Sequence, residues 1–391
     1  MATLPLADWT KREDLAQLIA ALGADNARYV GGAVRDTLLG KTIHDVDLAT
    51  PLLPHEVIDR CREAGIRTVP TGIDHGTVTA ILPAGPVEIT TLRRDVSTDG
   101  RRATVAFAQE WKDDASRRDF TINALYAHPE SLEIDDYFGG VADLERGHVR
   151  FIGEAEERIR EDHLRILRYF RFQARFGDAL DEEAVNACRD LAHTLKGLSR
   201  ERVAMELLAI LALPAPSPTL RLMKDLGVLE VTLPEARDRE TQCLAQLVET
   251  EAREGVEGDA VRRLAALLPP IKSVAESVAA RLRLSRQQRA RLVCAAERRE
   301  EDAVAPRALA YFEGVEGARD RLLLKGESVA ALCDWDVPQL PLKGGEIVAR
   351  GVGAGPEVAR TLRAVEARWV EEGFPDRSRV LELLEHELAA S

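Results

Sequence analysis

Two aspartates separated by one residue, Asp45 and Asp47, are the residues whose types and spacing most directly suggest chemistry. Their segment, HDVDLAT, alternates polar and apolar residues, which predicts a strand with both carboxylates on one face. Paired carboxylates need a cation, and hard oxygen ligands suit Mg²⁺. Two such ions about 3.5–4 Å apart are the usual apparatus for in-line nucleotidyl displacement. The sequence therefore predicts a two-metal Mg²⁺ site at Asp45 and Asp47, with Glu88 of the PVEIT segment as a third acid from a neighbouring strand.

A glycine pair lies shortly before these aspartates, in the segment YVGGAVRD. Gly31 and Gly32 would let the backbone approach a phosphate closely, and the helix that they open would point its N–H groups the same way. Arg35 lies about one turn into that helix, where its guanidinium could clamp a triphosphate.

Each motif alone has an ordinary structural explanation. An isolated D-x-D is more often a solvated turn or a helix cap than a metal site, and a lone glycine pair is a weaker signal still. The catalytic interpretation depends on their combination, GGAVRD followed by DVDLAT in a strand–helix–strand order.

The elements around these motifs change character along the chain. Up to about residue 127, short β-rich runs such as TVTAILP mix with helical stretches, whereas from about residue 155 apolar residues recur at helical spacing. The prolines of LPAPSPT (213–219) predict a linker between helices. The expected fold class is α+β, with a small mixed sheet followed by helices only. Its expected divisions are a catalytic head (1–150), a helical neck (151–212) and a helical body and tail (213–391).

Composition limits the class of protein. The 391 residues are enough for two to four domains, and no apolar run of 18 or more residues exists. The N-terminus lacks the basic-then-apolar order of a secretion signal, so a cytoplasmic protein without a membrane span is expected. The five cysteines are scattered singly, which argues against a disulfide framework and a zinc site.

The charge balance bears on nucleic-acid binding. A net charge of −13 argues against a protein that coats nucleic acid non-specifically, although it permits a local basic groove. The arginine-rich segment 278–299 is the candidate for an RNA-backbone contact, with a solvated helix face as the alternative.

Six segments extend the pattern beyond the metal motif. They are GGAVRD with DVDLAT, TDGRR (98–102), RRDFTINAL (117–125), DYFGGVADL (136–144), EDHLRILRYFRF (161–172) and LSRERVAMEL (198–207). In type and order they resemble the motifs of bacterial-type (class II) tRNA nucleotidyltransferases, or CCA-adding enzymes, and their poly(A) polymerase relatives. The resemblance implies a DNA polymerase beta-like head with a metal and triphosphate site, followed by a mobile loop, a ribose-sensing motif, a hinge, a nucleotide-template helix and a neck.

The ribose-sensing resemblance assigns four residues to the sugar of a bound nucleotide. They are Arg117, Arg118, Asp119 and Asn123. A site that hydrogen-bonds a hydroxyl rejects the deoxy analogue strongly. The alternative is a helix start capped by Asp119.

The template-helix resemblance assigns base recognition to Asp162 and Arg165, which would share a helix face, with Glu161 bracing Arg165. An acceptor beside a donor matches cytosine and adenine, which present an amino group beside a ring nitrogen acceptor, and rejects uracil and guanine. Arg168 and Arg171 would continue that face. The alternative is an ordinary helical salt-bridge pattern.

The function implied is addition of CCA to the 3′ end of tRNA from CTP and ATP, with the tRNA acceptor arm as partner and no protein partner inferred. Poly(A) polymerase and CC-only or A-only tRNA nucleotidyltransferases are the alternatives within the class. An additional HD phosphohydrolase is disfavoured because no histidine lies between His193 and His386. A non-catalytic RNA-binding module is the alternative from another class.

Overall fold

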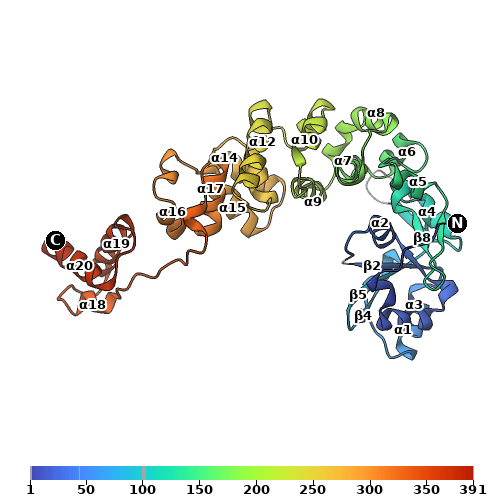
Figure 1. Ribbon diagram of the computed structural model, residues 1–391, viewed down its shortest axis with the longest axis horizontal. Coiled ribbons are helices and arrows are strands. Elements are labelled where there is room, and N and C mark those ends of the chain that lie inside the picture. The colour runs from blue at the N-terminus through green and yellow to red at the C-terminus, as the bar shows by residue number, and fades with distance from the viewer. Residues whose placement is uncertain (1, 44, 99–102, 391) are drawn as a thin grey trace. The chain divides into compact units, whose positions relative to one another are not determined.

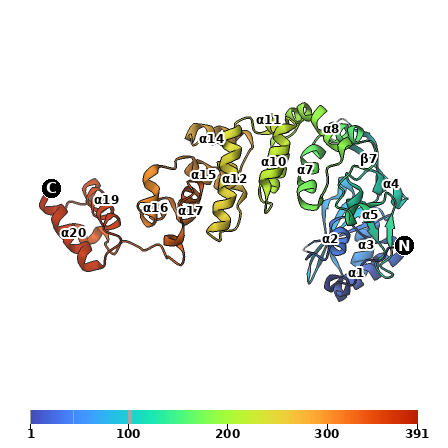
Figure 2. The same cartoon turned by 45° about the horizontal axis from the view of Figure 1, so that its top comes forward.

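The structure, a computed structural model, describes residues 2–43, 45–98 and 103–390 and divides into two compact units, Met1–Pro234 and Glu235–Ser391. Figures 1 and 2 show the strands gathered in the first unit. Beyond its last strand the described chain is helical, as the change in hydrophobic spacing predicted. The α+β fold class is therefore confirmed.

One mixed sheet organises the first unit. Within the described residues its order is β3-β4-β5-β2-β1-β8-β9. The pairs are antiparallel except β2 with β5, which run parallel. The strands are β1 (Arg28–Val30), β2 (Val46–Thr50), β3 (Arg67–Gly72), β4 (Thr77–Leu82), β5 (Gly85–Thr91), β8 (Leu125–Ala127) and β9 (Ile134–Asp136), and a separate hairpin joins β6 (Arg93–Thr98) to β7 (Ala103–Phe107).

The sheet buries one face and leaves the other open around β2 and β5. Val46 and Leu48 of β2 and Val87 and Ile89 of β5 are buried in the main core of this unit. Helices α1 (Glu13–Leu22) and α3 (Pro54–Glu63) contribute leucines, Val57 and Cys61 to the same core. Because side chains alternate along a strand, the residues between these apolar positions point to the opposite face, where they line a cavity.

The first unit contains further helices besides α1 and α3. They are α2 (Gly32–Leu38), α4 (Trp111–Ser116), α5 (Gly140–Glu145), α6 (Ala155–Glu161), α7 (Arg165–Phe176), α8 (Glu182–Asp190), α9 (Arg200–Leu211), α10 (Pro216–Asp225) and α11 (Val228–Thr232). The linker prediction for 213–219 is wrong in part, since α10 already begins at Pro216. Proline is tolerated there because first-turn N–H groups have no partner within the helix.

The second unit is built from helices packed around buried charge as well as apolar side chains. They are α12 (Asp238–Arg253), α13 (Ala260–Ala266), α14 (Lys272–Arg281), α15 (Arg286–Ala296), α16 (Pro306–Glu313), α17 (Val315–Leu324), α18 (Gly344–Val348), α19 (Pro356–Glu371) and α20 (Arg377–Ala390). Arg262 is 2% exposed and pairs with Glu251 at 2.7 Å and Asp320 at 3.3 Å. Trp369 is buried in a separate cluster formed by the last three helices.

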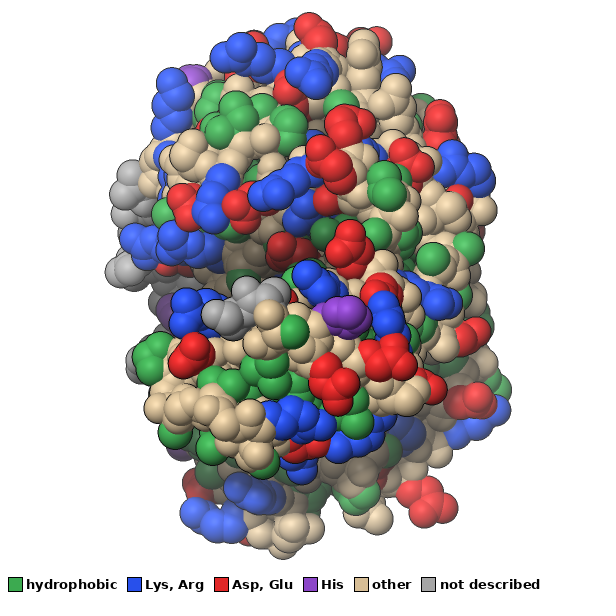
Figure 3. Space-filling model, turned by 90° about the vertical axis from the view of Figure 1, so that its left-hand side faces the viewer, with side chains coloured by type: hydrophobic (Ala, Val, Ile, Leu, Met, Phe, Trp, Pro, Cys, Tyr) green, Lys and Arg blue, Asp and Glu red, His purple; other side chains and the backbone are tan. Residues whose placement is uncertain are grey.

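Three features bear on the other expectations from composition. No helix in the described part of the chain is long and apolar enough to cross a membrane. All five cysteines are free. On the face shown in Figure 3, basic and acidic side chains are interspersed.

Candidate active site

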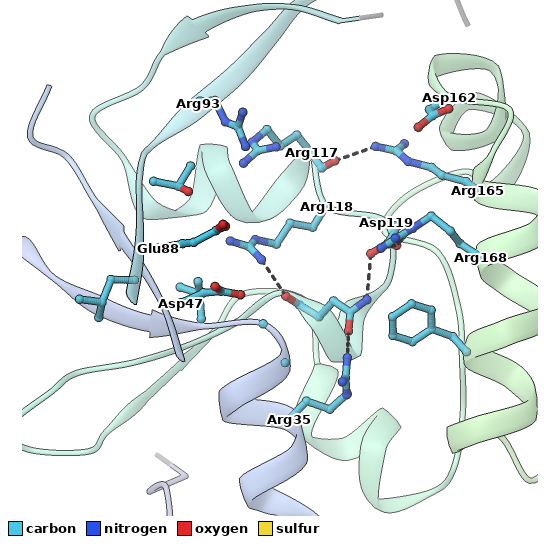
Figure 4. A pocket seen from close by; sticks show the side chains of 17 residues that line it. Arg35, Asp47, Glu88, Arg93, Arg117, Arg118, Asp119, Asp162, Arg165 and Arg168 are labelled. Atoms are coloured by element: carbon cyan, nitrogen blue, oxygen red, sulfur yellow. Dashed lines mark hydrogen bonds and ion pairs between the residues drawn. The ribbon is translucent and has the colours of Figure 1, made fainter. Parts of the chain in front are cut away.

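A cavity of about 440 Å³ opens on the polar face of β2 and β5 and is closed by residues of the neck helix α7. Figure 4 shows Asp47 and Glu88 on one side of it, with Arg118 reaching toward them, and Asp162, Arg165 and Arg168 on the other side. Every predicted site residue lines this cavity except Asp45, Glu161 and Arg171. Its volume lies in the range of small-ligand sites.

Two carboxylates from adjacent strands form the acidic wall. Asp47 and Glu88 are direct partners in the parallel register of β2 and β5, so both side chains project from the same face. Burial, followed by repulsion from Glu88, raises the pKa of Asp47, and Arg118 opposes this. Closely spaced acids of this kind offer oxygen donors that fit a hard divalent cation.

Asp45 does not take the position predicted for it. The strand begins one residue later, at Val46, and Asp45 is exposed and outside the cavity lining, although it adds to the raised pKa of Asp47. Among the described residues, no group of three His, Cys, Asp or Glu side chains is arranged to hold a metal. The acids brought together at the cavity are therefore Asp47 and Glu88.

Gly31 is required by its backbone and by a close neighbour. Its φ of +63° favours glycine, and a Cβ there would lie 3.2 Å from Nη1 of Arg118. Gly32 begins α2, as the glycine pair predicted. Both glycines line the cavity, and their phosphate-binding role stays a prediction.

Arg35 lies at the cavity but is only 6% exposed. Its guanidinium donates to Asp36 at 2.8 Å and to Asn123 at 2.5 Å, and it lies 4.3 Å from the ring centroid of Phe176. These contacts hold Arg35 against the protein interior, which the expectation of a triphosphate clamp did not include.

Asp114, at 1% exposure, holds two arginines of the cavity and was not predicted from the sequence. It accepts hydrogen bonds from Arg117 at 2.6 Å, Arg118 at 3.3 Å and the Tyr126 hydroxyl at 2.5 Å. Burial alone would raise the pKa of Asp114, but Arg118, Arg117 and Tyr126 hold it at about 2. The available signal was the spacing of Asp114 three and four residues before two arginines.

Asp119 and Asn123 form a connected polar pair. Asp119 accepts from Arg168 at 2.7 Å and from Nδ2 of Asn123 at 3.0 Å, and attraction to these partners lowers its pKa against the opposing effect of burial. The alternative of a helix start capped by Asp119 is wrong. The only helical turn there is 3₁₀, Thr121–Asn123, and Phe120 is its N-cap.

The predicted single helix across EDHLRILRYFRF is broken. Helix α6 ends at Glu161, Asp162 has extended backbone with φ −147° and ψ 104°, and α7 begins at Arg165. Asp162 and Arg165 therefore do not share a helix face through i, i+3 spacing, yet both line the cavity. The side chain of Asp162 accepts from Arg202 at 2.6 Å, and that of Arg165 donates to the Arg117 carbonyl at 2.8 Å.

Two predicted neck residues support the cavity from outside its lining. Glu161 pairs with Arg165 at 2.6 Å, as its spacing predicted, whereas Arg171 pairs with Glu206 at 2.7 Å instead of entering the cavity. Lining residues that were not predicted include Thr90, Arg93 and Phe172. They carry no local motif, and only the tertiary fold brings them together.

The structure does not support the predicted mobile loop (98–102) or the predicted hinge (136–144). Residues 99–102 of the predicted mobile loop lie outside the described residues. In the predicted hinge, Gly139 has a φ of +77°, and a Cβ on Gly140 would lie 2.2 Å from the Thr121 carbonyl oxygen. A turn and a close approach thus explain both glycines, and the hinge role stays a prediction.

Comparisons with known proteins agree with this geometry. A family model described as "Poly A polymerase head domain" matches residues 27–150, and one described as "Probable RNA and SrmB- binding site of polymerase A" matches residues 179–239. "CCA tRNA nucleotidyltransferase 1, mitochondrial" of Mus musculus is 34% identical over 388 residues, covering 93% of this chain and 87% of the relative. A "CCA-adding enzyme" of Leuconostoc mesenteroides is 42% identical over 198 residues, covering 50% and 48%. The crystal structure of the Bacillus stearothermophilus CCA-adding enzyme in complex with CTP superposes with a TM-score of 0.76 at 26% identity, covering 97% of this chain and 98% of that one.

Acids that face arginines across a nucleotide-sized cavity meet the needs of nucleotidyl transfer, and the head is that of a metal-dependent nucleotidyltransferase. With a relative 34% identical across most of both chains, this chain belongs to the tRNA nucleotidyltransferase/poly(A) polymerase family.

Proposed function

We propose that this chain adds CCA to the 3′ end of tRNA by template-independent nucleotidyl transfer from CTP and ATP, releasing pyrophosphate. The observation that carries the proposal is one cavity that combines the Asp47–Glu88 acid pair with Asp162 and Arg165. Such a cavity has groups for a metal–triphosphate complex at one side and for a base edge at the other.

The acids are assigned to the metal. Asp47 and Glu88 would hold Mg²⁺, with Asp45 adjacent to complete the coordination. When bound, Mg²⁺ lowers the pKa of the attacking 3′-hydroxyl and neutralises charge on the triphosphate. Arg118, anchored by Asp114, orients the triphosphate, and Gly31 leaves room for that arginine.

Asp162 and Arg165 are assigned to the base. Arg165 uses three of its five N–H donors on Glu161 and the carbonyls of Arg158 and Arg117, which leaves two for a ring nitrogen. Asp162 accepts from Arg202 and from the Leu164 backbone N–H, and a carboxylate has further lone pairs for an exocyclic amino group. Cytosine and adenine satisfy both groups, whereas uracil and guanine leave both unpaired.

The remaining residues are assigned to the sugar and the RNA. Asn123, oriented by Asp119 and Arg35, is the candidate for the ribose hydroxyls. Residues 1–150 are proposed as catalytic head, 151–212 as neck and 213–391 as body and tail that bind the tRNA acceptor arm. In the arginine-rich segment, Arg286 and Arg289 are exposed, whereas Arg281 pairs with Glu235 and Arg291 with Asp320. The cytoplasmic location stays a prediction, since the mouse relative is named mitochondrial.

Primer extension tests the proposal. Purified protein with Mg²⁺ and a tRNA ending at the discriminator base should add two residues with CTP alone and three with CTP plus ATP. Stopping after CC, extending only tRNA that ends in CC, or making long A tails would assign the chain to a relative with partial or poly(A) activity.

A matched variant separates catalysis from binding. Asp47→Ala should lose extension while retaining tRNA affinity, because it removes an acid of the cavity and no surface arginine. Wild-type protein that binds tRNA but extends no RNA would contradict the enzymatic assignment and favour the binding module.

A further inference from the structure

Six side chains form a closed polar ring between the head and helix α7. Asp119 accepts hydrogen bonds from Arg168 at 2.7 Å and from Asn123 at 3.0 Å. Asn123 in turn accepts a hydrogen bond from Arg35 at 2.5 Å. Asp36 accepts hydrogen bonds from Arg35 at 2.8 Å and from Arg175 at 3.3 Å. Arg168 and Arg175 lie two turns apart on α7, so the helix itself closes the ring. Figure 4 shows the part of this ring that faces the cavity.

The ring fixes the direction of the Asn123 amide. Arg35 can only donate, so it requires the amide oxygen, and the Asp119 carboxylate can only accept, so it requires the amide nitrogen. One N–H and one lone pair of the amide then remain for a ligand in the cavity. Rotation of the amide by half a turn would break both contacts, which makes one orientation strongly preferred.

Arg35 holds this position through two aromatic rings, of which Phe172 lines the cavity and Phe176 does not, and through an ion pair. Its guanidinium lies 5.3 Å from the ring centroid of Phe172 and 4.3 Å from that of Phe176. Asp36, 9% exposed, divides its two oxygens between Arg35 and Arg175. Arg175 and Asp36 do not line the cavity, so a change at Arg175 reaches the nucleotide site through Asp36 or through Phe176, both of which contact Arg35.

We propose that the Asp36–Arg175 pair is a positioning device that orients Asn123 and thereby sets the preference for ribonucleoside over deoxyribonucleoside triphosphates. The inference rests on the proposed nucleotide site. When Arg175 is lost, both oxygens of Asp36 become available to Arg35, whose planar fork matches a carboxylate bidentately. Arg35 then withdraws from Asn123, the amide loses its fixed direction, and the hydrogen bond to a ribose hydroxyl weakens.

The test compares CTP with dCTP in full-length Arg175→Met protein. The ratio of kcat/KM for CTP to that for dCTP, on tRNA lacking CCA, should fall about tenfold, the size of effect carried through a contact network. Arg175→Lys keeps the charge facing Asp36 and should restore most of the preference. Phe176→Leu removes the aromatic face against which both Arg35 and Arg175 lie, and it should lower the same ratio.

Arg160→Met is the matched control, because Arg160 forms a surface pair with Glu156 away from the ring and should leave the ratio unchanged. If kcat/KM falls by the same factor for CTP and for dCTP in Arg175→Met and Phe176→Leu, the proposal is overturned. Arg175 and Phe176 would then have only a structural role. An equal fall of the ratio in Arg160→Met would overturn it as well.

Equilibrium binding of CTP and dCTP in the presence of Mg²⁺ separates this inference from the proposed function. If wild-type protein binds CTP in preference to dCTP but extends no tRNA, the proposed function fails and the ratio of dissociation constants still tests the ring. If wild-type protein binds neither nucleotide, both proposals are overturned.

Discussion

At the scale of single residues, Asp114 shows how one buried carboxylate can organise a cationic wall. It anchors Arg117 and Arg118, and the carbonyl of Arg117 in turn receives Arg165 from the neck. Asp114 therefore supports Arg118, which is assigned to the triphosphate, and, through Arg117, also Arg165, which is assigned to the base. Asp114 itself contacts neither ligand in the proposed mechanism.

Asp114→Asn should lower kcat/KM for CTP incorporation about tenfold and destabilise the first unit. The pKa of about 2, against an ordinary value of 3.8, corresponds to about 2 kcal/mol of stability at neutral pH. Because the folded pKa is depressed, this stability is present above about pH 4 and is lost as the pH falls toward 2. Urea unfolding at pH 7 and at pH 3 checks the expectation.

The neighbouring Asp113 supplies the control, since it is exposed and takes the same substitution. Asp113→Asn should change neither activity nor the unfolding free energy measurably. A variant Asp114→Asn with wild-type stability at pH 7 would contradict the role assigned to the ion pairs.

At the scale of elements, the break between α6 and α7 gives Asp162 its position. Helix α9 supports that break, because Arg202 in its first turn holds Asp162 at 2.6 Å. Arg202→Met should free the carboxylate to rotate and lower the preference for CTP over UTP about tenfold, within the range of one base contact. Single-nucleotide incorporation with each triphosphate measures it.

Arg200→Met serves as the comparison for Arg202, since Arg200 lies two residues earlier in α9 and, among the described residues, its side chain donates to the Lys196 carbonyl and not to Asp162. Both variants remove an arginine from the start of α9. A loss of preference of the same size in both would show that helix α9 as a whole, and not the contact with Asp162, is responsible.

Helix α5 packs against the 3₁₀ turn through Gly140. Gly140→Ala would place a Cβ 2.2 Å from the Thr121 carbonyl oxygen, so we expect destabilisation of about 1–3 kcal/mol, the usual effect of overpacking. A Cβ at Gly345, in helix α18, meets no atom within 4 Å, so Gly345→Ala should be neutral or slightly stabilising. Urea unfolding of the two variants decides between them, and equal stability would disprove the close approach.

Sequence reasoning succeeded at this scale where a signal was local. The PVEIT segment predicted Glu88 on a strand neighbouring that of Asp47, and the two residues are partners in the register of β2 and β5. The break at Asp162 was missed because EDHLRILRYFRF contains no proline or glycine, whereas the Asp162 side chain accepts both from the Leu164 backbone N–H and from the distant Arg202. The pairing of Arg171 with Glu206 was missed because it joins two helices that are distant in sequence.

At the scale of the whole molecule, an acidic protein is proposed to bind an acidic substrate, so its basic contacts must be few and local. The double variant Arg286→Gln/Arg289→Gln should weaken tRNA binding. The slope of the logarithm of the tRNA association constant against the logarithm of the salt concentration should become shallower by about one to two, because one or two phosphate contacts are lost. CTP affinity should be unchanged. Filter binding over a range of salt concentrations checks this.

Arg319→Gln provides the control for the double variant, because Arg319 pairs with Glu316 on α17. An unaltered salt dependence in Arg286→Gln/Arg289→Gln would move the RNA contact elsewhere on the body and tail.

The buried charges of the second unit have a consequence for its behaviour on heating. Arg262, Arg263, Glu251 and Asp320 are all at most 3% exposed and paired with one another. The penalty for removing ions from water decreases as the temperature rises, whereas the gain from apolar burial levels off. As the temperature rises above room temperature, the second unit should therefore lose its folding free energy more slowly than a helical unit held by apolar packing alone.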